Sequence, residues 1–316
     1  MKALYIMSSP RGGSTLLSLA LGRHSQIANL GEVSFIPKLL SLHEDCTCKE
    51  RLSECPEWSN VFDSLCNMTG VDMRKTPYAL HLDDVMKYKG GTGKIDHNHQ
   101  KKWRMLRSKI RGAIDTILLK YQPEFGGKLI TLPSIKKGAN NTIKLYEAAS
   151  TVWDKDVVID ASKLPRKAVH LYKQQPENVR ILHLTRDSRG VCSSRKSHMD
   201  LEFAAKRWNY YHSTTIKLLD RWVSTEHRKQ LKYENFVSDP KKHLQDLCQW
   251  LEVPYSEDIL DFNNFVTEHS AGGNPTRFKF SEGIRPVDEK WKEVLTTQDI
   301  NLLDSINSEL NQLLGY

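Results

Sequence analysis

The sequence of 316 residues predicts an α/β fold in which a central parallel sheet is flanked by helices on both faces. Short apolar runs typical of buried strands alternate along the chain with segments of helical periodicity. Two of these runs end in a turn that carries arginine, glycine and hydroxyl side chains. In open parallel sheets, ligands collect at the carboxyl ends of the strands. We therefore expect the two turns to lie at one edge of the sheet.

The first turn follows an apolar strand predicted at residues 3–7 and precedes a helix that reaches about residue 23. Glycines in such a turn let the backbone bend tightly and approach a phosphate with no Cβ in the way. Backbone N–H groups at the helix start, together with the helix dipole, favour a bound anion. An arginine adds a permanent charge that can bind two oxygens at once, and hydroxyl groups add donors. The residues concerned are Arg11, Gly12, Gly13, Ser14 and Thr15.

This turn differs from the two common nucleotide-binding loops. A Walker A loop has lysine directly before its Ser or Thr, whereas Gly13 holds that position here and the cation is Arg11. The Gly-x-Gly-x-x-Gly fingerprint of dinucleotide-binding proteins is absent as well. The turn is therefore predicted to bind an anion, but not as a nucleoside triphosphatase or a dehydrogenase would. The alternative is an ordinary strand-to-helix turn that happens to hold two glycines.

The second turn follows a buried strand predicted at residues 180–185. Residues 186–195 then supply arginines, serines and a glycine at the start of a helix. Two cationic strand ends in one α/β chain indicate two anion subsites on the same edge of the sheet.

The remaining chain is interpreted as one domain, residues 1–316, with a mostly helical insertion at about residues 34–150. A further strand is predicted at residue 157. A helix at 200–222 has an apolar inner face, a short strand lies near 230–233, Asp239-Pro240 caps a helix, and the last helix covers 298–314. The inner face of the helix at 200–222 consists of Leu201, Ala204, Trp208, Thr215, Leu218 and Trp222.

Inside the insertion, an apolar stripe lies on one face of a helix and lysines and arginines surround it. The preferred interpretation is a solvated basic face, and the alternative is a basic wall beside an anionic acceptor. Residues 88–94 form a glycine-rich loop and a candidate lid. The stripe consists of Trp103, Leu106, Ile110, Ile114 and Ile117.

The composition gives 46 basic and 38 acidic residues, a net charge of +8. This balance suits an anionic ligand, but the sequence has no zinc-finger spacing, no recognition-helix signature and no aromatic RNA-binding motif. We therefore expect no nucleic-acid partner. The start of the chain does not resemble a signal peptide, and no window approaches the ~20 apolar residues of a membrane span. A cytoplasmic protein without a transmembrane segment is predicted.

Six cysteines in a chain of this length do not indicate a disulfide scaffold. Cys46, Cys48 and Cys55, with His43 upstream, invite a metal interpretation, but their spacing lacks the paired Cys-x-x-Cys of structural zinc sites. The sequence favours a loop of free or redox-linked thiols, and we expect no metal.

Together the two turns resemble sulfotransferases that use 3′-phosphoadenosine 5′-phosphosulfate. Arg11 to Thr15 looks like that family's 5′-phosphosulfate loop, and Arg186 with Ser194 eight residues later looks like its 3′-phosphate motif. The resemblance implies a three-layer P-loop-like fold and is greater to the bacterial and carbohydrate-type branch than to the cytosolic phenol and steroid branch. Gly12 departs from the pattern, because the family usually has serine or threonine there. Further matching pieces, in the same order, are Gly31-Glu32 and residues 157–163, 231–235 and 273–278.

The resemblance also implies roles for single residues in sulfuryl transfer to a hydroxyl, or less often an amine, of a carbohydrate, lipid or small molecule. Arg11 and the loop amides from Gly12 to Thr15 would stabilise charge on the leaving oxygen, and Ser14 and Thr15 would bind the 5′-phosphate. The 3′-phosphate would be bound by Arg186 and Ser194. Tyr233 would lie near the adenine and Arg277 would close over the donor. For Arg186 the alternative is a salt bridge with Asp187, and for Tyr233 a core aromatic.

The general base is expected to be Glu32, with His97 and His99 as rivals. The alternative for Glu32 is a structural carboxylate that pairs with Arg11 or Lys163. Asp160, Ser162 and Lys163, at another strand end, would contact the donor or hold the loop. Two other functions stay open: a P-loop-type kinase acting on a small molecule, and a non-catalytic module that binds polyanions.

Overall fold

The computed structural model describes residues 1–82, 99–121, 129–261, 268–275, 277–278, 283–284, 286 and 289–316. Within residues 99–121 it describes the side chains of Leu106 and of residues 109–121. The candidate lid at residues 88–94 and His97 lie outside the described residues, as do the side chains of His99 and Trp103.

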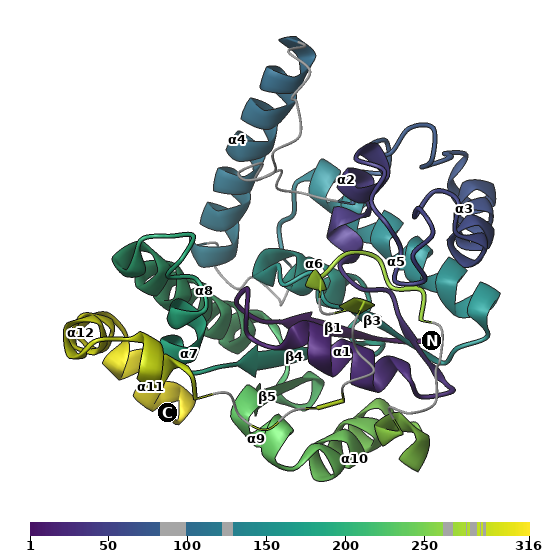
Figure 1. Ribbon diagram of the computed structural model, residues 1–316. Coiled ribbons are helices and arrows are strands. Elements are labelled where there is room, and N and C mark those ends of the chain that lie inside the picture. The colour runs from purple at the N-terminus through teal and green to yellow at the C-terminus, as the bar shows by residue number, and fades with distance from the viewer. Residues whose placement is uncertain are drawn as a thin grey trace.

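Five parallel strands form the central sheet in the order β2-β3-β1-β4-β5 (Figure 1). In the centre, Tyr5 of β1 lies opposite Asp160 of β3 and Ile181 of β4. Because all strands run the same way, the ends of β1, β3 and β4 meet at one edge, as predicted. The strands are β1 Lys2–Met7, β2 Ile27–Asn29, β3 Val157–Asp160, β4 Val179–Thr185 and β5 Arg228–Lys232.

Helices cover both faces of this sheet, so the predicted three-layer α/β architecture is confirmed. Alternate residues of β1 point to opposite faces. Tyr5 belongs to the apolar cluster shared with α5, α6 and α8, whereas Leu4 belongs to the cluster shared with α1 and α10. The helices are α1 Ser14–Gly22, α2 Ile36–Ser41, α3 Pro56–Thr69, α4 His99–Tyr121, α5 Pro133–Trp153, α6 Pro165–Gln174, α7 Ser188–Ser193, α8 Leu201–Trp222, α9 Tyr233–Ser238, α10 Pro240–Leu251, α11 Trp291–Val294 and α12 Thr297–Leu314. Short 3₁₀ helices are η1 Val33–Phe35, η2 Thr225–His227 and η3 Glu257–Leu260.

Some of the helices, including α8, α10 and α12, begin at a residue whose side chain caps them. Asp200 accepts a hydrogen bond from the Phe203 amide at the start of α8, and Asp239 accepts one from the Lys242 amide at the start of α10. Thr296 forms a capping box at the start of α12. The predicted inner face of α8 is buried throughout, and α12 packs against α8. These helices therefore follow from local sequence signals.

The described parts of the predicted insertion contain the helices α2 to α5, and α4 projects from them (Figure 1). Its apolar stripe is exposed: Leu106, Ile110, Ile114 and Ile117 have between 42% and 57% of their surface accessible. The helix docks instead through Asp115, which accepts a hydrogen bond from His170 Nε2 at 2.8 Å. Within the described residues, no helix combines the length and the apolar composition needed to cross a membrane.

Candidate active site

The first turn has the backbone of an anion-binding loop. Gly13 adopts φ 91° directly before Ser14 begins α1, and the Gly12 amide donates to the Ser9 carbonyl at 2.9 Å. Arg11 has φ 76°, a conformation that non-glycine residues rarely adopt. Strain of this kind is concentrated at functional sites. The loop therefore turns the first amides of α1 toward the sheet edge.

Close packing explains both glycines of the turn. A Cβ on Gly12 would overlap the Ser8 hydroxyl and approach the Ser9 carbonyl oxygen to 2.9 Å. A Cβ on Gly13 would overlap the ring of Tyr233. Gly12, the residue that departs from the family pattern, thus fits this chain because Ser8 fills the space that a larger side chain would need.

The second turn joins the first directly. Arg186, which follows β4, donates from Nη1 to the carbonyl of Arg11 at 3.0 Å. Its guanidinium also stacks on the ring of Tyr233, with Cζ 4.6 Å from the ring centroid. Tyr233 therefore contacts Gly13 on one turn and Arg186 on the other.

The salt bridge considered between Arg186 and Asp187 is not formed. Asp187 caps α7 by accepting from the Arg189 amide, and its carboxylate pairs with the Arg189 side chain at 2.7 Å. The guanidinium of Arg186 therefore contacts Arg11 and Tyr233 instead of Asp187. Ser194 follows α7, and its hydroxyl donates to the Val191 carbonyl at 2.7 Å.

Arg195, which follows α7, lies near two other arginines, Arg11 of the first turn and Arg207 of α8. The pKa of the Arg195 guanidinium is lowered by its burial and by the neighbouring charges of Arg207 and Arg11. Among the residues that the structure describes, no carboxylate forms an ion pair with Arg11, Arg195 or Arg207. Such mutual repulsion is offset when an anion lies between the cations.

Two buried hydroxyl groups lie at the same place. The hydroxyls of Ser8 and Ser9 are shielded from solvent and find no hydrogen-bond partner among the described residues. Buried polar groups without partners are uncommon in folded proteins. Amides, unpaired hydroxyls and arginines therefore converge on one edge of the sheet, which is suited to binding phosphate or sulfate.

The third strand end carries an ion pair. Lys163, which follows β3, donates from Nζ to Oε1 of Glu32, and both side chains are largely buried, with 15% and 20% accessible. Lys163 has φ 64°. The structural pairing considered for Glu32 is thus present with Lys163. A late loop, described at residues 268–275 and 277–278, reaches this pair, because Gly272 lies against the Cβ of Glu32 and the Asn274 amide donates to Thr15 Oγ1 at 3.3 Å.

Comparison with known proteins agrees with this geometry. Residues 3–257 match a model of the sulfotransferase family. The chain belongs to this family. Among solved structures, the sulfotransferase domain of the Synechococcus PCC 7002 olefin synthase has a similar fold, with 19% identity, a TM-score of 0.53, and coverage of 96% of this chain and 93% of that one.

The sulfotransferase domain of the curacin biosynthetic pathway is similar to the same degree. Its identity is 16% and its TM-score 0.52, over 98% of this chain and 96% of that one. At these identities the likeness establishes the fold. No curated protein gave a significant match.

In this sulfotransferase, the polar residues after β3 support the loop from inside the protein. Asp160 is fully buried, which raises its pKa, and it accepts hydrogen bonds from Tyr146 at 2.6 Å and from Ser162. Ser162 in turn accepts from the Ser34 amide at 2.9 Å. Of the two roles considered for these residues, the contacts favour holding the loop that carries Lys163.

Arg277 lies in the late loop and is buried, with 8% of its surface accessible. It donates to the carbonyls of Gly273 at 2.9 Å and Asp45 at 3.3 Å, so its guanidinium links the late loop to the insertion. Its contact with the donor stays a prediction.

Arg195 and Arg207 are site residues that the sequence interpretation did not single out. Arg195 is the last residue of the cationic segment after β4, and this position is the sequence signal that could have indicated it. Arg207 lies on α8, which carries no anion-binding motif, so only the fold brings it to the site.

Proposed function

We propose that this sulfotransferase takes its sulfuryl group from 3′-phosphoadenosine 5′-phosphosulfate and transfers it by in-line displacement to a hydroxyl of a carbohydrate, lipid or small-molecule acceptor. An amine is the less favoured acceptor group. The observation that carries the proposal is the bond from Arg186 to the Arg11 carbonyl, which unites two cationic strand ends into one site. A nucleotide with phosphates on two positions of its ribose can engage both turns at once.

The residues at this edge fit such a donor, which has anionic groups at two positions. Arg11, Arg195 and Arg207 supply positive charge that the described carboxylates do not neutralise. The unpartnered hydroxyls of Ser8 and Ser9 supply further donors. An arginine side chain can also bind two phosphate oxygens at once. Such a bidentate contact suits a phosphate ester better than the contact of a point charge does.

Each end of the donor is assigned to one turn. Ser14 and Thr15 bind the 5′-phosphate, because they occupy the start of α1 where amides and the helix dipole act together. Arg186 and Ser194 bind the 3′-phosphate, and Tyr233 contacts the adenine.

When bound, the donor supplies the sulfuryl group and a phosphate that can accept the departing electron pair. Arg11 and the loop amides of Gly12 to Thr15 stabilise the negative charge that develops on the oxygen between sulfur and phosphorus. Donors fixed in place before the reaction need no reorganisation during it, so they favour the transition state over the ground state. Positioning and charge neutralisation provide the rate enhancement, as in phosphoryl transfer.

Glu32 is proposed as the general base. Lys163 bonds to Oε1, which holds the carboxylate in a fixed orientation and leaves Oε2 to take the proton of the acceptor hydroxyl. The late loop supports this arrangement, since Gly272 packs against Glu32 and Asn274 bonds to Thr15. Arg277 holds that loop in place through Gly273.

Calorimetry distinguishes this function from the kinase alternative. Adenosine 3′,5′-bisphosphate should bind the protein with one site per chain without added metal, and ATP with Mg²⁺ should bind more weakly. If ATP with Mg²⁺ binds and the bisphosphate does not, the proposed donor is wrong. A screen with labelled donor across sugars, lipids, phenols and amines then identifies the acceptor. Polyanion binding with a steep salt dependence and no turnover would instead favour the non-catalytic module.

A further inference from the structure

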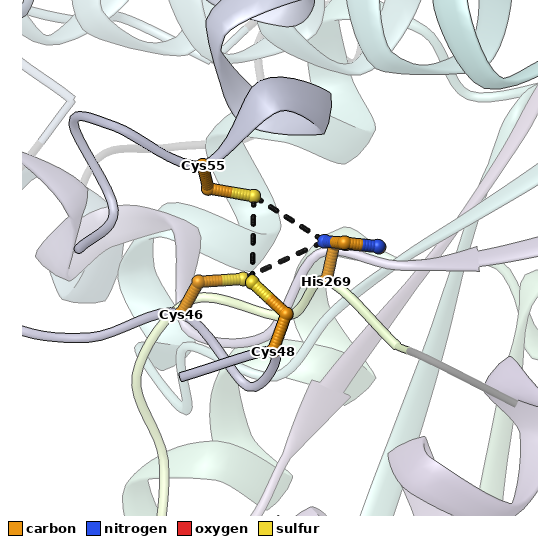
Figure 2. A group of neighbouring side chains, drawn as sticks. All are labelled: Cys46, Cys48, Cys55 and His269. Atoms are coloured by element: carbon orange, nitrogen blue, oxygen red, sulfur yellow. Dashed lines mark hydrogen bonds between the residues drawn. The ribbon is translucent and has the colours of Figure 1, made fainter. Parts of the chain in front are cut away.

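Three cysteines and one histidine converge about the base of the late loop (Figure 2). Cys46, Cys48 and Cys55 belong to the segment between α2 and α3, whereas His269 lies at the start of the late segment, 223 residues beyond Cys46. Cys46 and Cys55 are buried, and Cys48 and His269 are half-buried. The three sulfurs and one imidazole nitrogen all lie within 4.8 Å of one another.

Three of the six separations between the ligand atoms are close to those of a tetrahedral zinc site. With Zn–S near 2.3 Å and Zn–N near 2.0–2.1 Å, tetrahedral angles require sulfurs about 3.8 Å apart and sulfur–nitrogen distances of about 3.5 Å. Here the sulfurs of Cys48 and Cys55 are 3.7 Å apart. The Nδ1 atom of His269 lies 3.3 Å from the Cys55 sulfur and 4.0 Å from the Cys46 sulfur.

The backbone holds these ligands in place without using their side chains. A tight turn, in which the Lys49 amide donates to the Cys46 carbonyl at 2.9 Å, brings Cys48 back beside Cys46. Cys55 lies immediately before α3, and Trp58 in the first turn of that helix donates from Nε1 to the His269 carbonyl at 2.5 Å. The protein thus preorganises four ligand atoms from two distant segments.

A disulfide accounts for this arrangement less well. A bond between two sulfurs requires about 2.05 Å, and the pair of Cys48 and Cys55 is 3.7 Å apart. It would also leave the third cysteine and the histidine without a role. All three cysteines have free thiols. Three thiolates and a neutral imidazole are a donor set that zinc prefers.

We propose that Cys46, Cys48, Cys55 and His269 bind one zinc ion in a closed, structural Cys₃His site. With four protein ligands the ion has no open position for a substrate, so its contribution is to folding and not to the chemistry. This replaces the expectation of a metal-free thiol loop. The proposal does not depend on the identity of the sulfuryl donor.

The consequence of this site is a cross-link between the insertion and the late loop. Next to His269, Ser270 accepts from the Thr47 hydroxyl at 2.9 Å, and Ala271 forms bridges with both Cys46 and Gly31. The chain then continues into Gly272, which packs against Glu32, and Asn274, which bonds to Thr15. Because the metal fixes His269, it fixes the loop that contacts the proposed base and the first turn.

Metal analysis of the full-length protein tests the proposal. Protein purified under reducing conditions, or stripped with a chelator under reducing conditions and then given Zn²⁺, should hold one zinc ion per chain. Cobalt replacing zinc should give the d–d absorption bands of a tetrahedral site and thiolate charge-transfer bands. Cys55→Ser should lose the zinc. Cys66→Ser, a control thiol on α3 outside the cluster, should keep one ion per chain.

A conservative variant guards against loss of folding. His269→Cys should retain one zinc ion and shift the cobalt charge-transfer bands toward those of a four-sulfur site, whereas His269→Ala should weaken zinc binding at least tenfold in competition with a chromophoric chelator. Two results would overturn the proposal. One is reduced wild-type protein that takes up no stoichiometric zinc or cobalt. The other is zinc bound equally by wild type, Cys55→Ser and His269→Ala.

Discussion

The guanidinium of Arg186 donates a hydrogen bond to the backbone carbonyl of Arg11 at 3.0 Å, although the two residues are 175 positions apart in the sequence. Each residue lies in the turn after a central strand, β1 or β4, and these strands are neighbours in the sheet. The bond therefore fixes the distance between the two turns. If both turns bind one molecule, substitution of Arg11 and substitution of Arg186 should affect different parts of its binding or reaction.

Arg11→Ala should reduce turnover more than donor binding. In the proposed function its charge lies against the oxygen that gains negative charge, and removal of one such donor commonly costs ~10²–10³ in kcat. Steady-state kinetics and calorimetry with adenosine 3′,5′-bisphosphate would measure the two effects separately. Arg228→Ala, which removes a surface pair with Asp220, is the matched control and should change kcat less than about twofold. A large rise in the Kd of the bisphosphate with unchanged kcat would show that Arg11 binds the donor but does not contribute to turnover.

Gly12→Ser should lower both stability and activity, although serine is usual at this place in the family. Its Cβ would overlap the Ser8 hydroxyl and press on the Ser9 carbonyl. We expect a loss of about 1–3 kcal/mol in unfolding free energy, the usual cost of overpacking, measured by urea denaturation. Ser8→Gly combined with Gly12→Ser should recover part of that loss. No recovery would mean that the backbone contact, and not Ser8, excludes the side chain.

Glu32→Gln should reduce kcat by ~10²–10⁴, the usual contribution of a general base, while the Kd of the donor changes little. The amide can still accept a hydrogen bond from Lys163, so the loops keep their positions. Lys163→Met should lower activity less and should lower stability, because it leaves a largely buried carboxylate unpaired. If Glu32→Gln retains wild-type kcat, the base is another residue, and the histidines at 97 and 99 become the candidates.

The pair of His183 on β4 and His212 on α8 should make the protein sensitive to mild acid. Their rings are joined by a 2.8 Å hydrogen bond, and burial lowers the pKa of His183 to about 3 and that of His212 well below its usual range. In the unfolded chain each titrates near 6.5. The unfolded state therefore binds more protons as pH falls below 6.5, so stability decreases.

Each of these histidines should cost about 1.4 kcal/mol of stability between pH 7.5 and pH 5.5. Denaturation of wild type at both pH values, compared with His183→Gln, measures the contribution of one ring. The variant should be less stable at pH 7.5 but should lose about 1.4 kcal/mol less on acidification. An unchanged pH dependence would contradict the assignment of a neutral buried imidazole to His183.

The sequence predicted those parts of the fold whose signals are local. The strands ending at Met7, Asp160 and Thr185 were evident because parallel strands buried on both faces form continuous apolar runs. Strand β2 was missed, since three residues give no pattern. Helix α4 shows the reverse case. Its apolar stripe was evident, but the exposure of Ile110 and Ile117 depends on packing that the stripe does not encode.

The positions of the two turns at the strand ends were predictable for the same reason, because each turn lies within about ten residues. The partners with which side chains pair in the folded protein were not predictable from the sequence. The bond between Lys163 and Glu32 was one of two alternatives, and Arg207 entered the site only through the packing of α8. The spacing of the three cysteines argued against a metal site, and His269, which the structure places beside them, lies 214 residues after Cys55. Spacing rules for metal sites detect ligands only when they are close in sequence.

In the proposed function the two turns form one donor site, in which Arg186 recognises the 3′-phosphate. Calorimetry of adenosine 3′,5′-bisphosphate against adenosine 5′-monophosphate, on wild type, Arg11→Ala and Arg186→Ala, tests it most directly. Wild type and Arg11→Ala should prefer the bisphosphate by at least about tenfold, as one charge-assisted contact gives, and Arg186→Ala should lose the preference. A preference that survives in Arg186→Ala, or is absent from wild type, would contradict the account.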